Sequence, residues 1–242
     1  MTTLTKIIIA AVLSAVLTSC NFNMNLGPGI SGNGNVTTQD RNLTEDFNQI
    51  AVSAGVDVFL TQDDAPSLKV QTDENLQDII ITEIENGVLK IYADENIKSS
   101  ESKKVMVNVN NLQSISATSG SDVFSTNTII VDAIKIMATS GADIDMALDA
   151  QSTVLASTSG SDIKIKGTTN ILSASATSGS DIDAQYLISQ SCSAAATSGA
   201  DVVVHAKQKL TASATSAGGI KYYGNPTNES ISDTSGGSIS KR

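Results

Sequence analysis

The amino-acid sequence predicts an all-β fold, a single-stranded parallel β-helix in which each coil of the solenoid takes ~19–20 residues. Three observations favour this fold. A Thr-Ser-Gly-(Ser/Ala)-Asp motif recurs at nearly constant spacing, apolar and polar residues alternate on both sides of it, and aromatic residues make up only 3% of the chain. Hydrophobic residues still reach 40%, so the chain can fill a narrow bore with Ala, Val, Ile and Leu.

The repeated motif sets the period of the predicted fold. It begins at Thr118, Thr139, Thr158, Thr177 and Thr197, and degenerate copies begin at Thr215 and Thr234. Successive copies lie 21, 19, 19, 20, 18 and 19 residues apart. A unit this short cannot fold alone and must stack on its neighbours. Its Gly supplies the backbone conformation of a tight corner, where Ser and Asp can bond the backbone.

Columns of equivalent residues predict which side chains face the bore. The position after the motif is always β-branched, and apolar residues alternate with Ser, Thr or Lys in the stretch before it. A period of two indicates strands with one buried face. We therefore expect Ile144, Ile163 and Ile182 to lie over one another at ~4.8 Å. A β-sandwich of short hairpins, the rival fold, explains the alternation but not the fixed period.

The N-terminal part of the body is less regular. Ser53 to Val58 reads as an early copy of the corner, and the next clear corner ends at Asp122, 65 residues after Asp57. That gap predicts about three coils, larger than the later ones. Asn86-Gly87 is a turn signal between two strand-like runs.

The N-terminus predicts the cellular address. Residues 1–19 read as a signal peptide, with Lys6 before an apolar run too short to span a bilayer. The run ends in Leu-Thr-Ser-Cys, which resembles the bacterial lipobox and implies lipidation of Cys20. An ordinary secretion signal or an uncleaved anchor are the alternatives. Residues 20–36, rich in Asn and Gly, are expected to be a flexible tether. Residues 37–242 would form the β-helix domain, irregular over 37–112 and regular over 113–242.

Composition excludes several function classes. The formal net charge of -10 argues against nucleic acid as a partner. With one histidine, His205, the chain offers no His-ligated metal cluster, and we expect this side chain on the surface. Cys192 has no electropositive neighbour in the sequence, so we expect a small buried residue rather than a reactive thiol.

The body also resembles a bacterial family, the autotransporter adhesin head domain or GIN domain. The resemblance runs from about Phe47 to the C-terminus and rests on the repeated corners and on residues 47–50 leading to 55–58, 85–91, 112–115 and 220–226. It implies a right-handed parallel β-helix on an exported or lipid-anchored chain, of a kind frequent in Bacteroidetes. It transfers no catalytic residue. The last two corners lack the Asp, which marks the capping end of the stack.

The acidic column is the main candidate site. In stacked coils its carboxylates would form a ladder of like charges that repel one another. The members are Asp122, Asp143, Asp162, Asp181 and Asp201. Each Asp can accept a backbone N–H bond at its own corner, which gives it a structural role. The alternatives are Ca²⁺ between the rungs and recognition of a ligand. The sequence predicts no metal site and no cofactor otherwise.

These features predict a non-catalytic lipoprotein of the cell envelope that acts as an adhesin or binds a surface polymer or protein. Asn21 after the lipidated Cys favours the outer membrane, with the anchor in the membrane and a glycan or protein as partner. One alternative is a polysaccharide-active, pectin lyase-like enzyme, but a uniform ladder lacks the unlike carboxylates that divide acid and base roles. The other is a structural or oligomeric assembly protein, with copies joined through exposed strands or solenoid ends.

Overall fold

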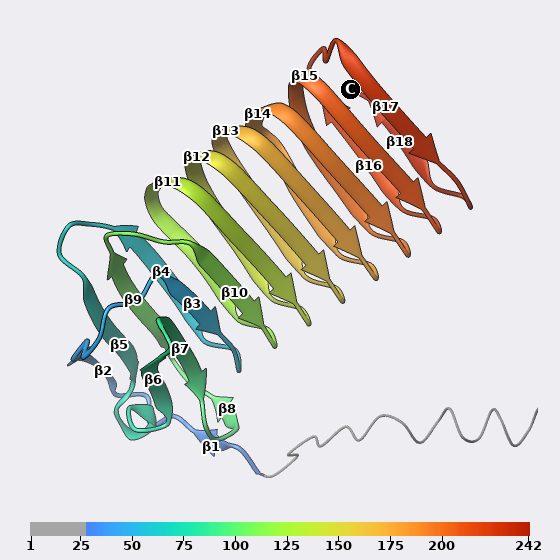
Figure 1. The fold of residues 1–242 in the computed structure, drawn as a ribbon. Helices are drawn as coiled ribbons and strands as arrows, with labels where there is room; N and C mark the ends of the chain where they lie inside the picture. The colour runs from blue at the N-terminus through green and yellow to red at the C-terminus, as the bar shows by residue number, and fades with distance from the viewer. Residues whose placement is uncertain (1–27) are drawn as a thin grey trace, which may run out of the picture.

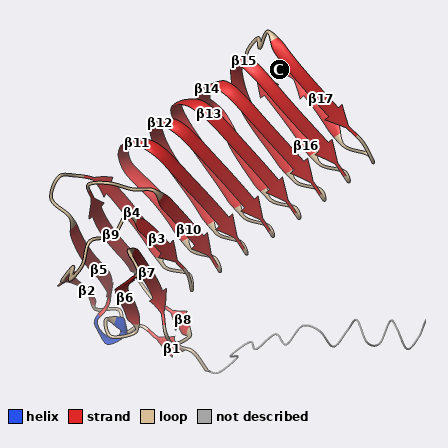
Figure 2. Ribbon diagram, in the orientation of Figure 1, coloured by secondary structure: helices blue, strands red, loops and turns tan. Residues whose placement is uncertain are grey.

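The computed structural model describes residues 28–242 and shows a parallel β-solenoid built almost wholly from strands (Figures 1 and 2). The expected signal peptide, the lipidation at Cys20 and the first part of the expected tether lie outside the described residues. No helix in the described part of the chain is long and apolar enough to cross a membrane.

The regular part consists of coils stacked in parallel. Five long strands each run from one corner to the next and so make a whole coil: β11 (Asp122–Thr139), β12 (Asp143–Thr158), β13 (Asp162–Thr177), β14 (Asp181–Thr197) and β15 (Asp201–Thr215). Shorter strands complete the stack: β10 (Ser114–Thr118), β16 (Gly219–Tyr223), β17 (Asn228–Asp233) and β18 (Ser238–Lys241). Each pairs in parallel with its counterpart on the next coil. The predicted fold class is confirmed.

The bore is filled by the columns that the sequence predicted to face inward. Ile144 pairs with Ile163, and Ile163 pairs with Ile182, and all three are buried. Ala, Ile and Leu from the stretch before each corner complete the core. Cys192 belongs to one of these columns, and burial raises the pKa of its thiol to about 12, as expected of an inert residue.

Each corner needs two residues in the left-handed backbone region. At the first regular corner, Ser119 has φ 57° and Gly120 has φ 68°, and later corners repeat this pair. The sequence assigned this conformation to Gly alone. The Gly120 N–H donates to the Ser140 carbonyl of the next coil at 3.2 Å, so the corners are joined along the stack.

The residue after each Gly is fully buried, which the sequence did not predict. It is always Ser or Ala in the five regular corners: Ser121, Ala142, Ser161, Ser180 and Ala200. The Ser161 hydroxyl lies 2.9 Å from the carbonyl oxygens of Ala138 and Thr158, so its polar atom is satisfied. A small side chain is required because the chain reverses direction there.

The irregular N-terminal part does not form the three stacked coils that the spacing predicted, so that prediction is wrong. Strands β3 (Gln49–Val52) and β4 (Asp57–Gln62) pair directly with β10 and β11, so the early corner lies one coil below the next. Its Gly55 N–H donates to the Ser119 carbonyl at 3.1 Å, which confirms it as a corner. The 65-residue gap is an excursion of the chain between two adjacent coils, and it includes antiparallel pairs.

The excursion forms one more rung and a cap. Strands β7 (Val88–Ala93) and β9 (Lys103–Val109) lie parallel to β3 and β4. Antiparallel strands cover them: β6 (Ile80–Glu85) pairs with β7, β5 (Ser67–Asp73) pairs with β9, and β2 (Val36–Arg41) pairs with β5. Asn86 and Gly87 form the predicted turn, both with positive φ. A short 3-10 helix, Glu74–Leu76, follows β5.

Residues 28–36, the end of the expected tether, are held against the body. Strand β1 (Ile30–Ser31) pairs with β8 (Ile97–Ser99). The buried carboxylate of Asp73 accepts the Gly34 N–H at 2.6 Å and the Glu101 N–H at 2.9 Å. A buried carboxylate needs hydrogen-bond donors, and these two N–H groups supply them. The bond from Gly34 thereby joins this segment to the body.

The last coil, β17 and β18, leaves the other end of the stack open to solvent (Figure 1). Its inward columns hold charges, since Glu229 pairs with Leu210 and Asp233 pairs with Ala214. Both side chains are exposed, as is Ile231 between them. Inward-pointing charges on an edge strand discourage pairing with another strand.

Candidate functional site

The predicted acidic column is brought together by the register of the coils. Asp122 pairs with Asp143, and the pairing continues through Asp162 and Asp181 to Asp201. Asp57 extends the column by one coil, because Val58 pairs with Val123. The side chains lie at the surface, partly or largely exposed.

Burial and mutual repulsion act on this column together. Partial desolvation, and next the charge of Asp122, raise the pKa of Asp143, while the backbone N–H of Asp162 partly offsets them. The pKa of Asp162 is raised in the same way, with Asp143 as the neighbouring charge. The sequence placed the helping N–H at the same corner, whereas it comes from the next coil.

The lower end of the column has counter-charges. Desolvation raises the pKa of Asp57, and the nearby cations Lys103 and Lys104 oppose that rise. The two middle carboxylates, Asp143 and Asp162, have similar surroundings, because each is partly desolvated, faces the charge of one neighbouring Asp and is helped by one backbone N–H. Among residues 28–242, no group of three or more His, Cys, Asp or Glu side chains is arranged to hold a metal ion.

A stacked pair of aromatic rings lies on the outer face beside the column. The centroids of Phe59 on β4 and Phe124 on β11 are 5.4 Å apart, and the ring planes differ by 29°. Lys104 Nζ lies 5.5 Å from the Phe59 centroid, within the range of a cation–π contact. Each Phe follows the β-branched residue of its own corner, so aligning the early corner with the later ones would have revealed the pair.

His205 lies on the same outer surface farther along the stack. Its ring is 6.4 Å from that of Tyr223, and the side chain is half-buried. It pairs with Ile188 rather than with the position that the repeat spacing suggests, because a bulge shifts the register between Ala184 and Ile188.

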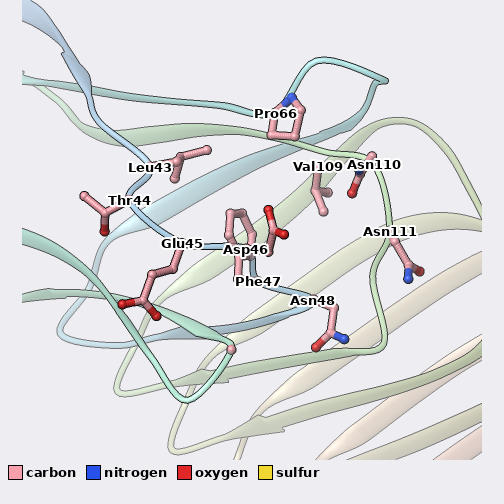
Figure 3. A pocket seen from close by; sticks show the side chains of 11 residues that line it. Leu43, Thr44, Glu45, Asp46, Phe47, Asn48, Pro66, Val109, Asn110 and Asn111 are labelled. Carbon is pink, nitrogen blue, oxygen red and sulfur yellow. The ribbon is translucent and has the colours of Figure 1, made fainter.

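A surface cavity of about 620 Å³ lies at the side of the N-terminal coils (Figure 3). The segment before β3 forms one wall, and the residues after β9 form the facing wall. Its lining consists of Leu43, Thr44, Glu45, Asp46, Phe47, Asn48, Pro66, Gly87, Val109, Asn110 and Asn111. No pattern in the sequence indicated this cavity, because its walls come from segments more than 60 residues apart.

Comparison with known families identifies the family of this chain. Residues 46–226 match the family described as "Putative auto-transporter adhesin, head GIN domain". The chain belongs to the GIN-domain family. The match includes the cavity wall from Asp46 onward and all the regular corners, and it ends before β17. The resemblance drawn from the repeated corners is therefore confirmed.

Solved structures share the fold of this GIN domain. A "putative adhesin" from Bacteroides fragilis is 22% identical with a TM-score of 0.82, covering 88% of this chain and 100% of that one. A "putative lipid binding protein" from Parabacteroides distasonis is 25% identical with a TM-score of 0.70, covering 88% and 99%. A "putative adhesin" from Parabacteroides merdae is 19% identical with a TM-score of 0.68, covering 88% and 98%. No curated protein matches the GIN-domain chain.

Proposed function

We propose that this GIN domain is a non-catalytic binding protein of the cell envelope, an adhesin that presents a stiff β-solenoid to a glycan or protein partner. The observation that carries the proposal is the register of β11 to β15 on both sides of each corner, which lines up equivalent outward side chains over successive coils. Such a surface suits repeated contacts with an extended partner. The adhesin names of the family and of the neighbours support it.

The proposal includes a lipid anchor at Cys20, in the outer membrane. Its support is the signal-like run that ends in Leu-Thr-Ser-Cys and the Asn21 that follows. The full chain with Cys20→Ala should lose incorporation of radiolabelled palmitate, whereas Cys192→Ala should keep it. Labelling that persists in Cys20→Ala would contradict the anchor. Fractionation of membranes from the unmodified chain then tests the outer-membrane address.

The enzyme alternative predicts a different result. A polysaccharide-active solenoid would release new sugar ends from pectin or a related polymer. We expect no release above that of an Ile163→Asp variant, because Asp143 and Asp162 at the middle of the column have similar surroundings, which do not divide proton donor from acceptor. Steady release by the unmodified chain would overturn the non-catalytic assignment.

We also propose that the acidic column has a structural role and needs no cation. The support is the backbone N–H from the following coil, which lowers the pKa of Asp143 and Asp162 and partly offsets the desolvation and repulsion that raise it. EDTA should then leave the melting temperature unchanged, and Ca²⁺ should not raise it. A melting temperature that falls in EDTA and recovers with Ca²⁺ would establish a cation site instead.

Binding of free lipid, suggested only by the name of the Parabacteroides distasonis neighbour, is not part of the proposal. The bore of the coils is packed with buried Ile, Leu, Val and Ala side chains, which leave no room for an acyl chain there.

Adhesion is tested with the full chain displayed on cells. Cells that carry the anchored protein should bind to polysaccharide- or protein-coated surfaces more than cells that carry the Cys20→Ala form. Equal binding by the two populations on every surface would refute an adhesive role. Both forms contain the same folded domain, so the comparison isolates display at the cell surface.

A further inference from the structure

We infer that the cavity beside the N-terminal coils is a binding site for a neutral glycan. The inference rests on the proposed adhesive function and names the class of ligand and the place where it binds. The cavity volume of about 620 Å³ lies within the usual range for ligand sites, roughly 300–1,000 Å³.

Polar side chains from two segments converge on this space. Asp46 and Asn48 come from the segment before β3, and Asn110 and Asn111 come from the loop after β9; Figure 3 shows all four around the same opening. Within residues 28–242, none of these four side chains makes a hydrogen bond to another protein group. Their donors and acceptors are therefore free for a ligand.

The main chain that carries these side chains is fixed by the sheet. The Asn48 N–H donates to the Gly87 carbonyl at 3.2 Å, and the Asn48 carbonyl accepts the Gln113 N–H at 2.7 Å. On the facing wall, Gln62 Nε2 donates to the Asn110 carbonyl at 3.3 Å. The backbone that carries Asn48 and Asn110 is thus fixed before a ligand arrives, so only the side chains must be ordered on binding.

The chemistry of the lining selects sugar hydroxyls. Each Asn amide offers two donors and an acceptor, and the Asp46 carboxylate offers acceptors, so together they match hydroxyl groups that both donate and accept. Half-buried Leu43 and exposed Pro66, which also line the cavity, supply apolar surface for the C–H groups of a sugar ring.

Charge then restricts the kind of glycan. The lining contains two carboxylates, Glu45 and Asp46, and neither Lys nor Arg. A uronic-acid or sulfated sugar would meet like charge without a compensating cation. The site should therefore prefer neutral sugars.

The test uses the purified full chain on an array of neutral oligosaccharides, namely glucan, mannan and galactan fragments, with matched uronic-acid and sulfated oligosaccharides. Calorimetry then measures the affinity of the neutral sugars that bind. The double variant Asn110→Ala/Asn111→Ala should weaken binding by about tenfold or more, because it removes two sets of hydrogen bonds. Asn170→Ala, an exposed Asn on β13, is the matched control and should bind as the unmodified chain does. Unchanged melting temperatures would show that both variants fold.

A second variant tests the charge argument. Asp46→Asn keeps the size of the side chain and should reduce the preference for neutral over uronic-acid sugars. The inference is overturned if no neutral sugar on the array binds, if only acidic sugars bind, or if the double variant binds as tightly as the unmodified chain. The proposed adhesive function is tested separately, by cell adhesion of the double variant. If the double variant binds sugar as tightly as the unmodified chain and its cells still adhere, this site is refuted and the adhesive function is not.

Discussion

Ile144 on β12 and Ile163 on β13 are register partners at the centre of the bore, and each is only 1% exposed. Ile182 on β14 continues the column. Each of these side chains packs against the equivalent one in the coils above and below, so the stability of any coil depends on its neighbours.

Replacing Ile163 by Asp should abolish cooperative folding, because it buries an unpaired charge among apolar side chains. The matched control is Ile171→Asp, the same substitution on the same strand at a side chain that is 57% exposed. We expect the control to change the free energy of unfolding by no more than about 0.5 kcal/mol. Thermal melts followed by circular dichroism measure both. A normal melt for Ile163→Asp would contradict the inward column.

Replacement by Ala should destabilise the protein to different degrees at Gly160, in the corner before β13, and at Gly167, within β13. Gly160 has φ 68° and open space where a Cβ would lie, so Gly160→Ala should cost about 1 kcal/mol from backbone conformation alone. At Gly167, φ is 122° and a Cβ would lie 1.9 Å from the Leu148 carbonyl oxygen. Gly167→Ala should therefore be more destabilising in urea unfolding. Equal losses in the two variants would show that steric contact does not decide the difference.

The acidic column should make stability depend on pH. The folded pKa of Asp162 is raised above the unfolded value of about 3.8, mainly by desolvation and then by Asp143. At pH values between the unfolded and the folded pKa, the folded state therefore binds more protons than the unfolded state. The free energy of unfolding should fall as the pH rises through that window and stay lower above it. Asp162→Asn should raise the melting temperature at pH 7 and reduce the difference between pH 7 and pH 4.

The control for this prediction is Asp132→Asn, at an exposed Asp outside the column. It should leave the pH dependence of melting as it is in the unmodified chain. If Asp162→Asn lowered the melting temperature at pH 7, its hydrogen bonds would outweigh repulsion, and the view of the column as a set of repelling charges would be wrong.

The charged last coil should limit end-to-end association. Glu229 and Asp233 occupy inward columns that hold Leu210 and Ala214 one coil earlier. Glu229→Leu with Asp233→Ala would leave an apolar, unpaired parallel edge, so we expect concentration-dependent association in light scattering. Ser230→Ala with Ser232→Ala, on the alternate positions of β17, is the control. Association of the unmodified chain through this end, unaffected by the charge substitutions, would refute the blocking role.

The sequence by itself determined the period, the corners, the inward columns and the line of Asp residues. The reason is that, in a solenoid, residues one repeat apart in the sequence lie in contact on adjacent coils. The family followed from the same repeats. The Asn86-Gly87 turn was also predictable, since a local backbone requirement produces it.

Only the tertiary structure decided how the chain between β4 and β10 leaves the stack, because strand pairing over such distances depends on packing rather than on local pattern. The same holds for the cavity between Asp46 and Asn110, whose walls come from separate segments. Their proximity results from β3 and β4 lying directly against β10 and β11, a register that no spacing in the sequence expressed.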